Sequence, residues 1–315
     1  MRKMTTLNAG QLLALAKSVV PPLQYTKHKG QAGRVAVIGG CKEYTGAPYF
    51  AAISALKAGA DLSHVFCTEG ASPVIKAYSP ELIVHPVLDW TNSVGEILQW
   101  LPRFHSIVVG PGLGREEQIL NSTSAVIEKA KEKNIPIVID ADGLFLVTQN
   151  PAIIKGYTNA VLTPNAAEFG RLYKKVFNTD PNSEEPVDSV KQLCRELGSV
   201  TIVHKGAHDI ISDGDKVLMY FNPGSPRRCG GQGDLLSGTM GLFAAWAKFA
   251  QDESPSESIS TYPYGMQAAY LACALTRECA RRAFQLNGRS MTTTDMIAQI
   301  HASFEDLFSE PQSVS

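Results

Sequence analysis

A glycine-rich loop that leads directly into an apolar segment holds the residues best suited to chemistry. Gly230, Gly231 and Gly233 fall within four positions, and Asp234 follows them at the start of DLLSGTMGLFAAWAKF. Glycines let the backbone turn tightly and bring its N–H groups close to an anion. The positive end of a helix dipole favours a phosphate at the same place. The pattern therefore predicts a phosphate-binding loop at a helix start.

The carboxylate of Asp234 has two interpretations. A carboxylate repels a neighbouring phosphate, so it needs a reason to be there. One reason is general-base catalysis, in which it accepts the proton of a hydroxyl that attacks a phosphoryl group. The other is a helix N-cap, where Asp is favoured on structural grounds alone. An isolated Gly-x-Gly-Asp leaves both interpretations open.

Glycine or polar clusters also follow five apolar segments that are expected to be strands. They are Gly39-Gly40, 110–114, Asp140-Ala141-Asp142, 165–168 and Lys205-Gly206. In open α/β sheets ligands bind at the carboxyl edge of the strands, where such clusters meet. Their convergence predicts a ligand site at that edge.

Two of these clusters carry charged residues with a structural alternative. Asn165 and Glu168 are spaced as a capping box, and Glu168 is also suited to hold Mg²⁺ through water. Lys205 is suited to meet a phosphate as a point charge, or it is a hairpin lysine in water. His208 is expected to be a polar loop residue. Asp140 and Asp142 are suited to tune a magnesium site, and the alternative for Asp142 is a helix cap.

The glycines of the segment 110–114 would let a nucleotide lie against the backbone, or they form a tight strand-to-helix turn. The sequence has no G-x-x-x-x-G-K-[ST] motif, so it is not a P-loop NTPase. The segment VAVIGGCKEYTGAP lacks the G-x-G-x-x-G spacing of the dinucleotide fingerprint.

Apolar strands that alternate with helices predict an α/β fold with a mostly parallel sheet covered on both faces. Helices are expected over residues 7–20, 48–60, 118–134, 234–250, about 262–285, and 294–308. Strands are expected within 34–40, 62–68, 106–114, 135–143, 160–169 and 200–221, with a hairpin turn at Asp213-Gly214. The polar stretches 178–186 and 251–258 are predicted to be surface loops of one domain spanning 1–315.

The composition excludes several classes of function. The chain has 315 residues, 44% of them hydrophobic, and a net charge of −1, which provides no field for nucleic acid. No apolar run approaches ~20 residues, so no membrane span is expected. The six cysteines form no C-x-x-C pair and are expected to be reduced. The first 22 residues lack a cleavage site and are poor in Arg, so the cytoplasm is the expected compartment.

Five motifs occur in a family-specific order: VVGPGLGR, PIVIDADGL, LTPNAAEF, VHKGAHD and GSPRRCGGQGDLLSG. Together they resemble the ATP-dependent NAD(P)H-hydrate dehydratases of the ribokinase-like superfamily, over about residues 25–308. Members of this family repair NADH or NADPH whose nicotinamide ring is hydrated at C6. ATP phosphorylates the C6 hydroxyl, and the phosphate is then eliminated. Gly-x-Gly-Asp alone indicates only the superfamily.

The resemblance implies a role for each motif. Asp234 would be the catalytic base. Glu168 would hold Mg²⁺ through water, and ATP would be the co-substrate. The residues implied to bind ATP are Lys205, Gly206, Ala207, His208, Asp209, Gly224, Ser225, Pro226, Arg227, Arg228, Cys229, Gly230, Gly231, Gln232 and Gly233. Those implied to bind the hydrated nucleotide are Gly112, Gly114, Asn165, Ala166, Ala167, Glu168, Phe169, Gly170, Arg171 and Asp234. Many relatives in the superfamily have a small residue where this chain has Gln232.

Two other functions compete with dehydration. One is a vitamin-type small-molecule kinase of the same superfamily, and GPGLG with TPN-x-x-EF favours the dehydratase over it. The other is a non-catalytic nucleotide-binding module, which would gain nothing from a carboxylate facing phosphate. Small molecules are the expected partners. The sequence leaves open the choice between NADH and NADPH hydrates and the oligomeric state, although relatives form homo-oligomers.

Overall fold

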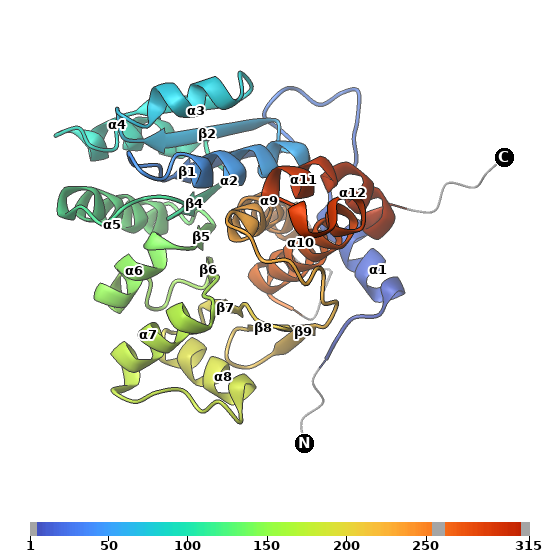
Figure 1. Cartoon of the computed structure of the whole chain (residues 1–315). Helices are drawn as coiled ribbons and strands as arrows, with labels where there is room; N and C mark the ends of the chain where they lie inside the picture. The colour runs from blue at the N-terminus through green and yellow to red at the C-terminus, as the bar shows by residue number, and fades with distance from the viewer. Residues whose placement is uncertain (1–4, 254–261, 310–315) are drawn as a thin grey trace.

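A nine-stranded sheet runs through the molecule with helices against both faces (Figure 1). The computed structural model describes residues 5–253 and 262–309. The strand order is β3-β2-β1-β4-β5-β6-β7-β8-β9, parallel from β3 to β7 and antiparallel at β8 and β9. The predicted mostly parallel sheet is confirmed. The strands are β1 (Arg34–Ile38), β2 (Leu62–Cys67), β3 (Ile83–Pro86), β4 (Ser106–Val109), β5 (Ile137–Ile139), β6 (Ala160–Leu162), β7 (Thr201–His204), β8 (Asp209–Ser212) and β9 (Val217–Tyr220).

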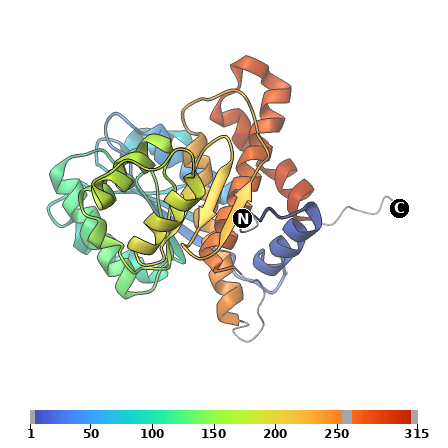
Figure 2. The same cartoon turned by 90° about the horizontal axis from the view of Figure 1, so that it is seen from below.

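The strands are apolar along their length because both faces of the sheet are covered. In β1, Val35 and Val37 pack into the core on one face, while Ala36 and Ile38 pack into the core on the other. Figure 2 shows the two helical layers on opposite sides of the strands. One layer contains α1 (Ala9–Val19), α2 (Gly46–Lys57), α3 (Ser72–Tyr78), α9 (Gln232–Glu253), α10 (Tyr264–Asn287), α11 (Thr293–Ala298) and α12 (Ile300–Phe308). The other contains α4 (Ser93–Trp100), α5 (Glu117–Glu132), α6 (Asp142–Gln149), α7 (Ala166–Phe177) and α8 (Pro186–Glu196).

Several elements differ from the sequence prediction. The helix predicted over 294–308 is two helices, because the N–H of Gln299 bonds to the carbonyl of Met296 (3.0 Å) in a tighter turn. Residues 251–253 of the predicted loop belong to α9, and 254–258 lie outside the described residues. The short elements β3, α3, α4 and α8 were not predicted, and for α6 only a possible start at Asp142 was considered. The hairpin at Asp213-Gly214 is confirmed, with a φ of +97° at Gly214.

The carboxyl ends of β1, β4, β5, β6 and β7 lie side by side, because these strands are parallel neighbours. The chain goes from β1 to β2 and β3, and then returns across β1 to β4, which makes the ligand-binding crevice of an open α/β sheet. The clusters that follow these strands therefore meet at one edge, as predicted. Among the described helices, none is long and apolar enough to cross a membrane.

Candidate active site

A cavity of about 600 Å³ lies at the carboxyl edge of the sheet. Its walls are the β7–β8 turn, the loop between β9 and α9, and the facing side of α10. The predicted ATP-binding residues that line it are Lys205, Gly206, Ala207, Asp209, Gly224, Ser225, Arg228, Cys229, Gln232 and Gly233. Pro226, Arg227, Gly230 and Gly231 belong to the same loop but do not line the cavity. His208 does not line it either, and its ring packs against Phe221 (4.8 Å between centroids).

The glycine loop is held in place from two sides. Gly231 has a φ of +94°, and a Cβ there would lie 2.7 Å from the Phe50 ring and 2.8 Å from Thr293 Oγ1. The hydroxyl of Thr293 also donates to the carbonyl of Gly230 (2.7 Å). On the other side, the amide of Gln232 donates to the carbonyl of Arg227 (3.1 Å). Gln232 therefore fixes the loop, which a small residue at this position could not do in this way.

Asp234 lies in the first turn of α9 and is 9% exposed. The helix begins at Gln232, two residues earlier, and no described residue forms a hydrogen bond with the Asp234 carboxylate. The structure therefore rules out the N-cap interpretation. The pKa of Asp234 is raised well above its ordinary value, mainly by burial and further by the negative charge of Asp140. The positive charge of Lys205 acts in the opposite direction. A raised pKa makes a carboxylate a better proton acceptor.

Asp140 and Lys205 form a buried ion pair beside Asp234. Lys205 Nζ lies 2.8 Å from Asp140 Oδ1, and the two side chains are 21% and 3% exposed. A Cβ on Gly233 would lie 3.5 Å from each of them, so the pair faces the start of α9. Burial disfavours the ammonium, but the carboxylate of Asp140 outweighs it and the pKa of Lys205 is raised. Lys205 is therefore a fixed cation, and the alternative of a hairpin lysine in water is wrong.

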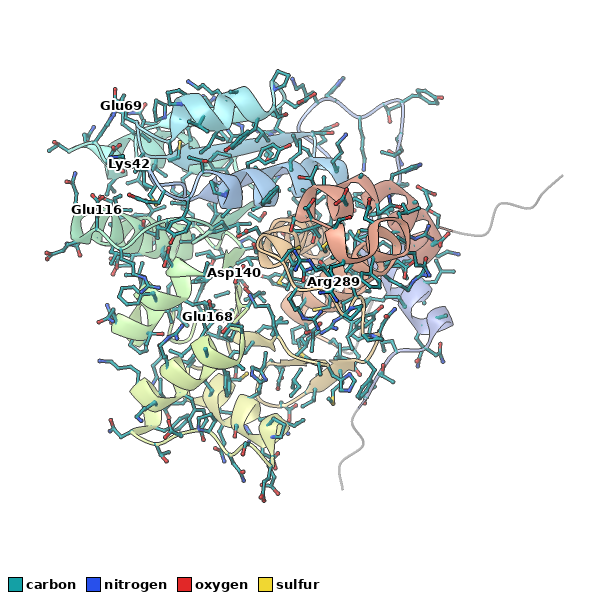
Figure 3. The ribbon with its side chains drawn as sticks, viewed as in Figure 1. Lys42, Glu69, Glu116, Asp140, Glu168 and Arg289 are labelled. Carbon is teal, nitrogen blue, oxygen red and sulfur yellow. The ribbon has the colours of Figure 1, made fainter. Side chains whose placement is uncertain are left out.

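Asn165 and Glu168 form the predicted capping box at the start of α7. The Glu168 N–H donates to Asn165 Oδ1 (3.0 Å), and the Asn165 N–H donates to Glu168 Oε2 (2.8 Å). Burial raises the pKa of Glu168, while the hydrogen bond from Asn165 and the charge of Lys205 act the other way. Figure 3 labels Glu168 in this first turn and Asp140 at the end of β5.

The residues at this edge fit a magnesium ion that arrives with a nucleotide. Glu168 Oε1 has no hydrogen-bond partner among the described residues, and the capping box holds it in place. No group of three His, Cys, Asp or Glu side chains in the described part of the chain forms a complete cage. Mg²⁺ usually takes one or two carboxylates together with phosphates and water, so such a cage is not required.

A second cavity of about 180 Å³ lies between α6 and α7. Arg115, Glu168 and Arg171 contribute to its wall, and two of these three were predicted to bind the hydrated nucleotide. Asp142 accepts from the Gly114 N–H (3.1 Å) and from Arg115 Nε (3.0 Å). It follows the N-cap of α6, so the prediction that Asp142 caps this helix is wrong.

Two of the other residues predicted to bind the hydrated nucleotide are buried. Phe169 is 3% exposed and its ring packs against His204, with 4.6 Å between centroids. Its side chain therefore belongs to the core and lines neither cavity. Gly112 has a φ of +60°, and a Cβ there would lie 2.4 Å from the Tyr44 carbonyl oxygen. Asn165, by contrast, lines the larger cavity, while Ala166 and Ala167 are exposed.

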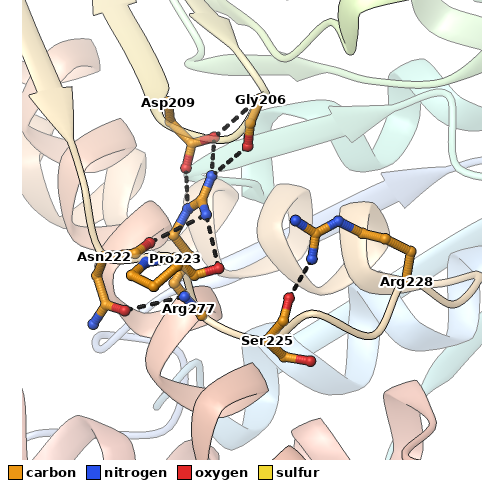
Figure 4. Close-up of polar contacts among 8 residues, drawn as sticks. Gly206, Asp209, Asn222, Pro223, Ser225, Arg228 and Arg277 are labelled. Carbon is orange, nitrogen blue, oxygen red and sulfur yellow. Dashed lines mark hydrogen bonds and ion pairs between the residues drawn. The ribbon is translucent and has the colours of Figure 1, made fainter. Parts of the chain in front are cut away.

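No local signal in the sequence predicted the far wall of the larger cavity. This wall comes from α10 and α11 and contains Cys273, Thr276, Arg277, Ala280 and Met296. These residues lie in segments that resemble ordinary core helices. Arg277 forms an ion pair with Asp209, 68 positions away (2.7 Å), and contacts the β9–α9 loop (Figure 4).

The mostly parallel sheet, with the glycine loop and the buried Asp234 at a helix start, has the fold of solved ribokinase-like structures. A ribokinase-like superfamily protein from Enterococcus faecalis has a TM-score of 0.75 at 18% identity, covering 98% of this chain and 98% of that chain. The ADP/ATP-dependent NAD(P)H-hydrate dehydratase from Bacillus subtilis, co-crystallised with ATP and Mg²⁺, has a TM-score of 0.68 at 18% identity, covering 97% of this chain and 100% of that chain. At these identities the two structures show the shared fold.

The sequence comparisons narrow this class to a family. A family model described as NAD(P)H-hydrate dehydratase matches residues 35–302. The ATP-dependent (S)-NAD(P)H-hydrate dehydratase of Homo sapiens is 57% identical over 296 residues, covering 94% of this chain and 84% of the human protein. The chain belongs to the NAD(P)H-hydrate dehydratase family.

Proposed function

We propose that this protein uses ATP to dehydrate (6S)-hydrated NADH or NADPH and so returns the reduced nucleotide to use. One observation carries the proposal: in a chain of this family, the buried carboxylate of Asp234 adjoins a cavity lined by the glycine loop. That combination provides a phosphate site and a proton acceptor next to each other.

ATP would occupy the larger cavity. Backbone N–H groups of the glycine loop and the positive end of α9 favour the triphosphate. Arg228 is exposed on this cavity, and its Nε and Nη2 have no partner among the described residues. The Asp140–Lys205 pair adds a fixed cation close to the start of α9. The adenine would lie toward the side chains of α10 and α11.

The first chemical step is phosphoryl transfer. The C6 hydroxyl of the hydrated ring attacks the γ-phosphorus, Asp234 accepts the hydroxyl proton, and ADP leaves with the bridging oxygen. In the second step the C6–O bond breaks, phosphate leaves, and a proton is lost from C5 to restore the ring double bond. A buried Asp234 with a raised pKa is suited to the first transfer.

The hydrated nucleotide would approach from the side of α6 and α7. Arg115 and Arg171 place positive charge at the second cavity, where the substrate has its phosphates. Gly114 brings its backbone close to the same place. Bound with ATP, Mg²⁺ would neutralise phosphate charge. Glu168 would hold the ion through water.

The competing vitamin-type kinase has support from the fold alone, whereas the family model and the human relative favour the dehydratase. The cytoplasm stays the proposed compartment, since all six cysteines are free thiols, as expected for a reducing environment. We propose a homo-oligomer by likeness to the family. We also propose that residues 1–315 form one domain.

The test is to incubate the protein with hydrated NADH, Mg²⁺ and ATP, and to follow the absorbance of the reduced nicotinamide. We expect the absorbance to return with ATP and to stay flat without nucleotide. ADP in place of ATP should be a poorer donor. A clear preference for ADP would overturn the choice of donor, and no recovery with either nucleotide would overturn the proposed function.

A further inference from the structure

The guanidinium of Arg277 has every N–H group occupied. Nε donates to Asp209 Oδ2 (2.7 Å), and Nη2 donates to Asp209 Oδ1 (2.7 Å) and to the Gly206 carbonyl (2.8 Å). Nη1 donates to the carbonyls of Asn222 (3.1 Å) and Pro223 (3.2 Å) (Figure 4). An arginine side chain has five N–H donors in a fixed plane, and these contacts use all five.

These contacts join three parts of the chain that are distant in sequence. Gly206 lies in the β7–β8 turn and Asp209 begins β8, Asn222 and Pro223 belong to the β9–α9 loop, and Arg277 belongs to α10. The turn, the loop and the helix are also the walls of the 600 Å³ cavity. The guanidinium therefore ties the first two walls to each other and to α10, in addition to the β8–β9 pairing and the ring contact between His208 and Phe221.

The ion pair at the centre of this arrangement is shielded from water. The side chains of Arg277 and Asp209 are 12% and 6% exposed. Both carboxylate oxygens of Asp209 accept from the guanidinium, and Oδ1 also accepts from the Gly206 N–H (3.3 Å). Asp209, predicted from the sequence to bind ATP, is therefore occupied in holding Arg277 and its own turn.

Arg228, a second arginine on the same cavity, has the opposite character. It is exposed, and among the described residues only its Nη1 has a partner, the carbonyl of Ser225 (Figure 4). It keeps donors for an anion, whereas Arg277 has none left.

We propose that Arg277 is a positioning residue for the nucleotide. It fixes the β7–β8 turn and the β9–α9 loop at the separation that ATP needs, and it does not itself bind phosphate. This inference rests on the proposed use of the larger cavity for ATP. Arg228, with its free donors, is the arginine that contacts the triphosphate.

Lysine substitution at the two arginines separates these roles. A lysine keeps the charge but has three donors on one nitrogen, so it cannot span Asp209 and two backbone segments in one plane. R277K should raise the KM for ATP by about tenfold or more, since small misplacements at a site are costly. It should leave the KM for the hydrated nucleotide near that of the parent. R228K removes donors that contact the triphosphate, so it should also raise the KM for ATP, but it should leave the contacts between the walls in place.

A second measurement tests whether Arg277 holds the β7–β8 turn and the β9–α9 loop in place, and it needs neither nucleotide nor turnover. In R277K, backbone amide exchange should speed up in both 206–209 and 222–225, whereas in R228K it should not change in 206–209, because Arg228 contacts only Ser225 among the described residues. D209N, which removes the carboxylate charge, should speed up exchange in the same two segments. A thermal melt of each variant shows whether it is folded. This readout does not depend on the reaction that the enzyme performs.

The outcomes separate failure of this inference from failure of the proposed function. If the parent shows no ATP-dependent activity, the proposed function fails. The exchange data still decide whether Arg277 holds the β7–β8 turn and the β9–α9 loop in place. If the parent is active but R277K retains its KM for ATP and its exchange pattern, Arg277 is not a positioning residue. If R277K raises the KM for ATP and the KM for the hydrated nucleotide equally and also lowers the melting temperature, Arg277 only stabilises the fold and does not position the nucleotide.

Discussion

Asp234 lies where its ionised carboxylate is unfavourable, so its presence there calls for a functional reason. It is buried in the first turn of α9, and the nearby Asp140 carboxylate adds to its cost of ionisation. Its carboxylate has no hydrogen-bond partner in the described part of the chain, and it does not cap the helix. The proposed role as a proton acceptor next to the proposed phosphate site accounts for this placement, and a helix cap does not.

At Asp234, we predict that D234N reduces kcat by ~10²–10⁴, the range for loss of a positioned general base. The asparagine keeps the size of the side chain and removes a negative charge from the phosphate site, so ATP should bind as well or more tightly. The loss should appear in kcat and not mainly in KM, because the interaction is made during proton transfer. Steady-state kinetics with a thermal melt as control measure this. A mutant that melts like the parent and keeps most of its kcat would remove Asp234 from the mechanism.

At Glu168, we predict that E168Q raises the Mg²⁺ concentration for half-maximal activity by about 10–100-fold, as for other groups that hold a metal through an outer contact. Glutamine still completes the capping box with Asn165, so α7 should stay folded. The KM for the hydrated nucleotide should change less than the Mg²⁺ requirement. Titration of Mg²⁺ in both proteins decides, and an unchanged Mg²⁺ dependence would leave Glu168 as a cap only.

At the scale of elements, the glycine loop and α9 work as one unit. Three glycines close together look alike in sequence, but their surroundings differ. Gly231 needs a positive φ and lies against Phe50 and Thr293, whereas a Cβ on Gly230 would meet no atom within 4 Å. Only the packing of α2 and α11 against the loop creates this difference.

For this loop, we predict that G231A destabilises the protein by ~1–3 kcal/mol, from backbone strain and the close contact with the Phe50 ring. G230A is the matched control, and it should change the free energy of unfolding by less than about 0.5 kcal/mol, as at an open site. Denaturant unfolding of the two variants measures both. Equal effects would mean that the loop is not held at Gly231.

The edge of the sheet at β2 and β3 supplies a pH prediction. His64 Nδ1 and His85 Nε2 are 2.9 Å apart, and burial lowers the pKa of each imidazole to about 4. Below pH ~6.5 the unfolded chain takes up protons at these residues, while the folded chain does so only near pH 4. Stability should therefore fall as the pH is lowered through this window, by on the order of several kcal/mol. H85Q should reduce the slope of unfolding free energy against pH between these values, and an unchanged slope would contradict the assignment.

The sequence predicted the elements whose pattern is local. Parallel strands with apolar runs, the capping box at Asn165 and the glycine loop before α9 all follow from short segments. The edge strand β3 has four residues and ends in Pro86, so it lacks a strand pattern. Arg277 could not be predicted as part of the site, because its partners lie at the β7–β8 turn and the β9–α9 loop and meet it only after folding. The ion pair that holds Lys205 depends in the same way on β5 and β7 lying two strands apart.

At the scale of the whole molecule, the sheet order brings together groups from every part of the chain. Asp140, Glu168, Lys205 and Asp234 come from four separate parts of the chain, after β5, in α7, after β7 and in α9, and α10 closes the cavity from a later part of the sequence. If 1–315 is a single domain, we expect one cooperative thermal unfolding transition. ATP should raise the melting temperature of that transition, because it binds the folded state. The same edge could serve a kinase, so the fold alone does not separate kinase from dehydratase.

The most direct test of the central claim is the ratio of ADP formed to reduced nicotinamide recovered, measured in one reaction with hydrated NADH, ATP and Mg²⁺. Phosphorylation of the C6 hydroxyl followed by elimination predicts one ADP for each reduced nicotinamide, with free phosphate as the other product. ADP formed without recovery of the reduced nicotinamide would indicate a kinase. Recovery without consumption of ATP would contradict the proposed role of the loop and of Asp234.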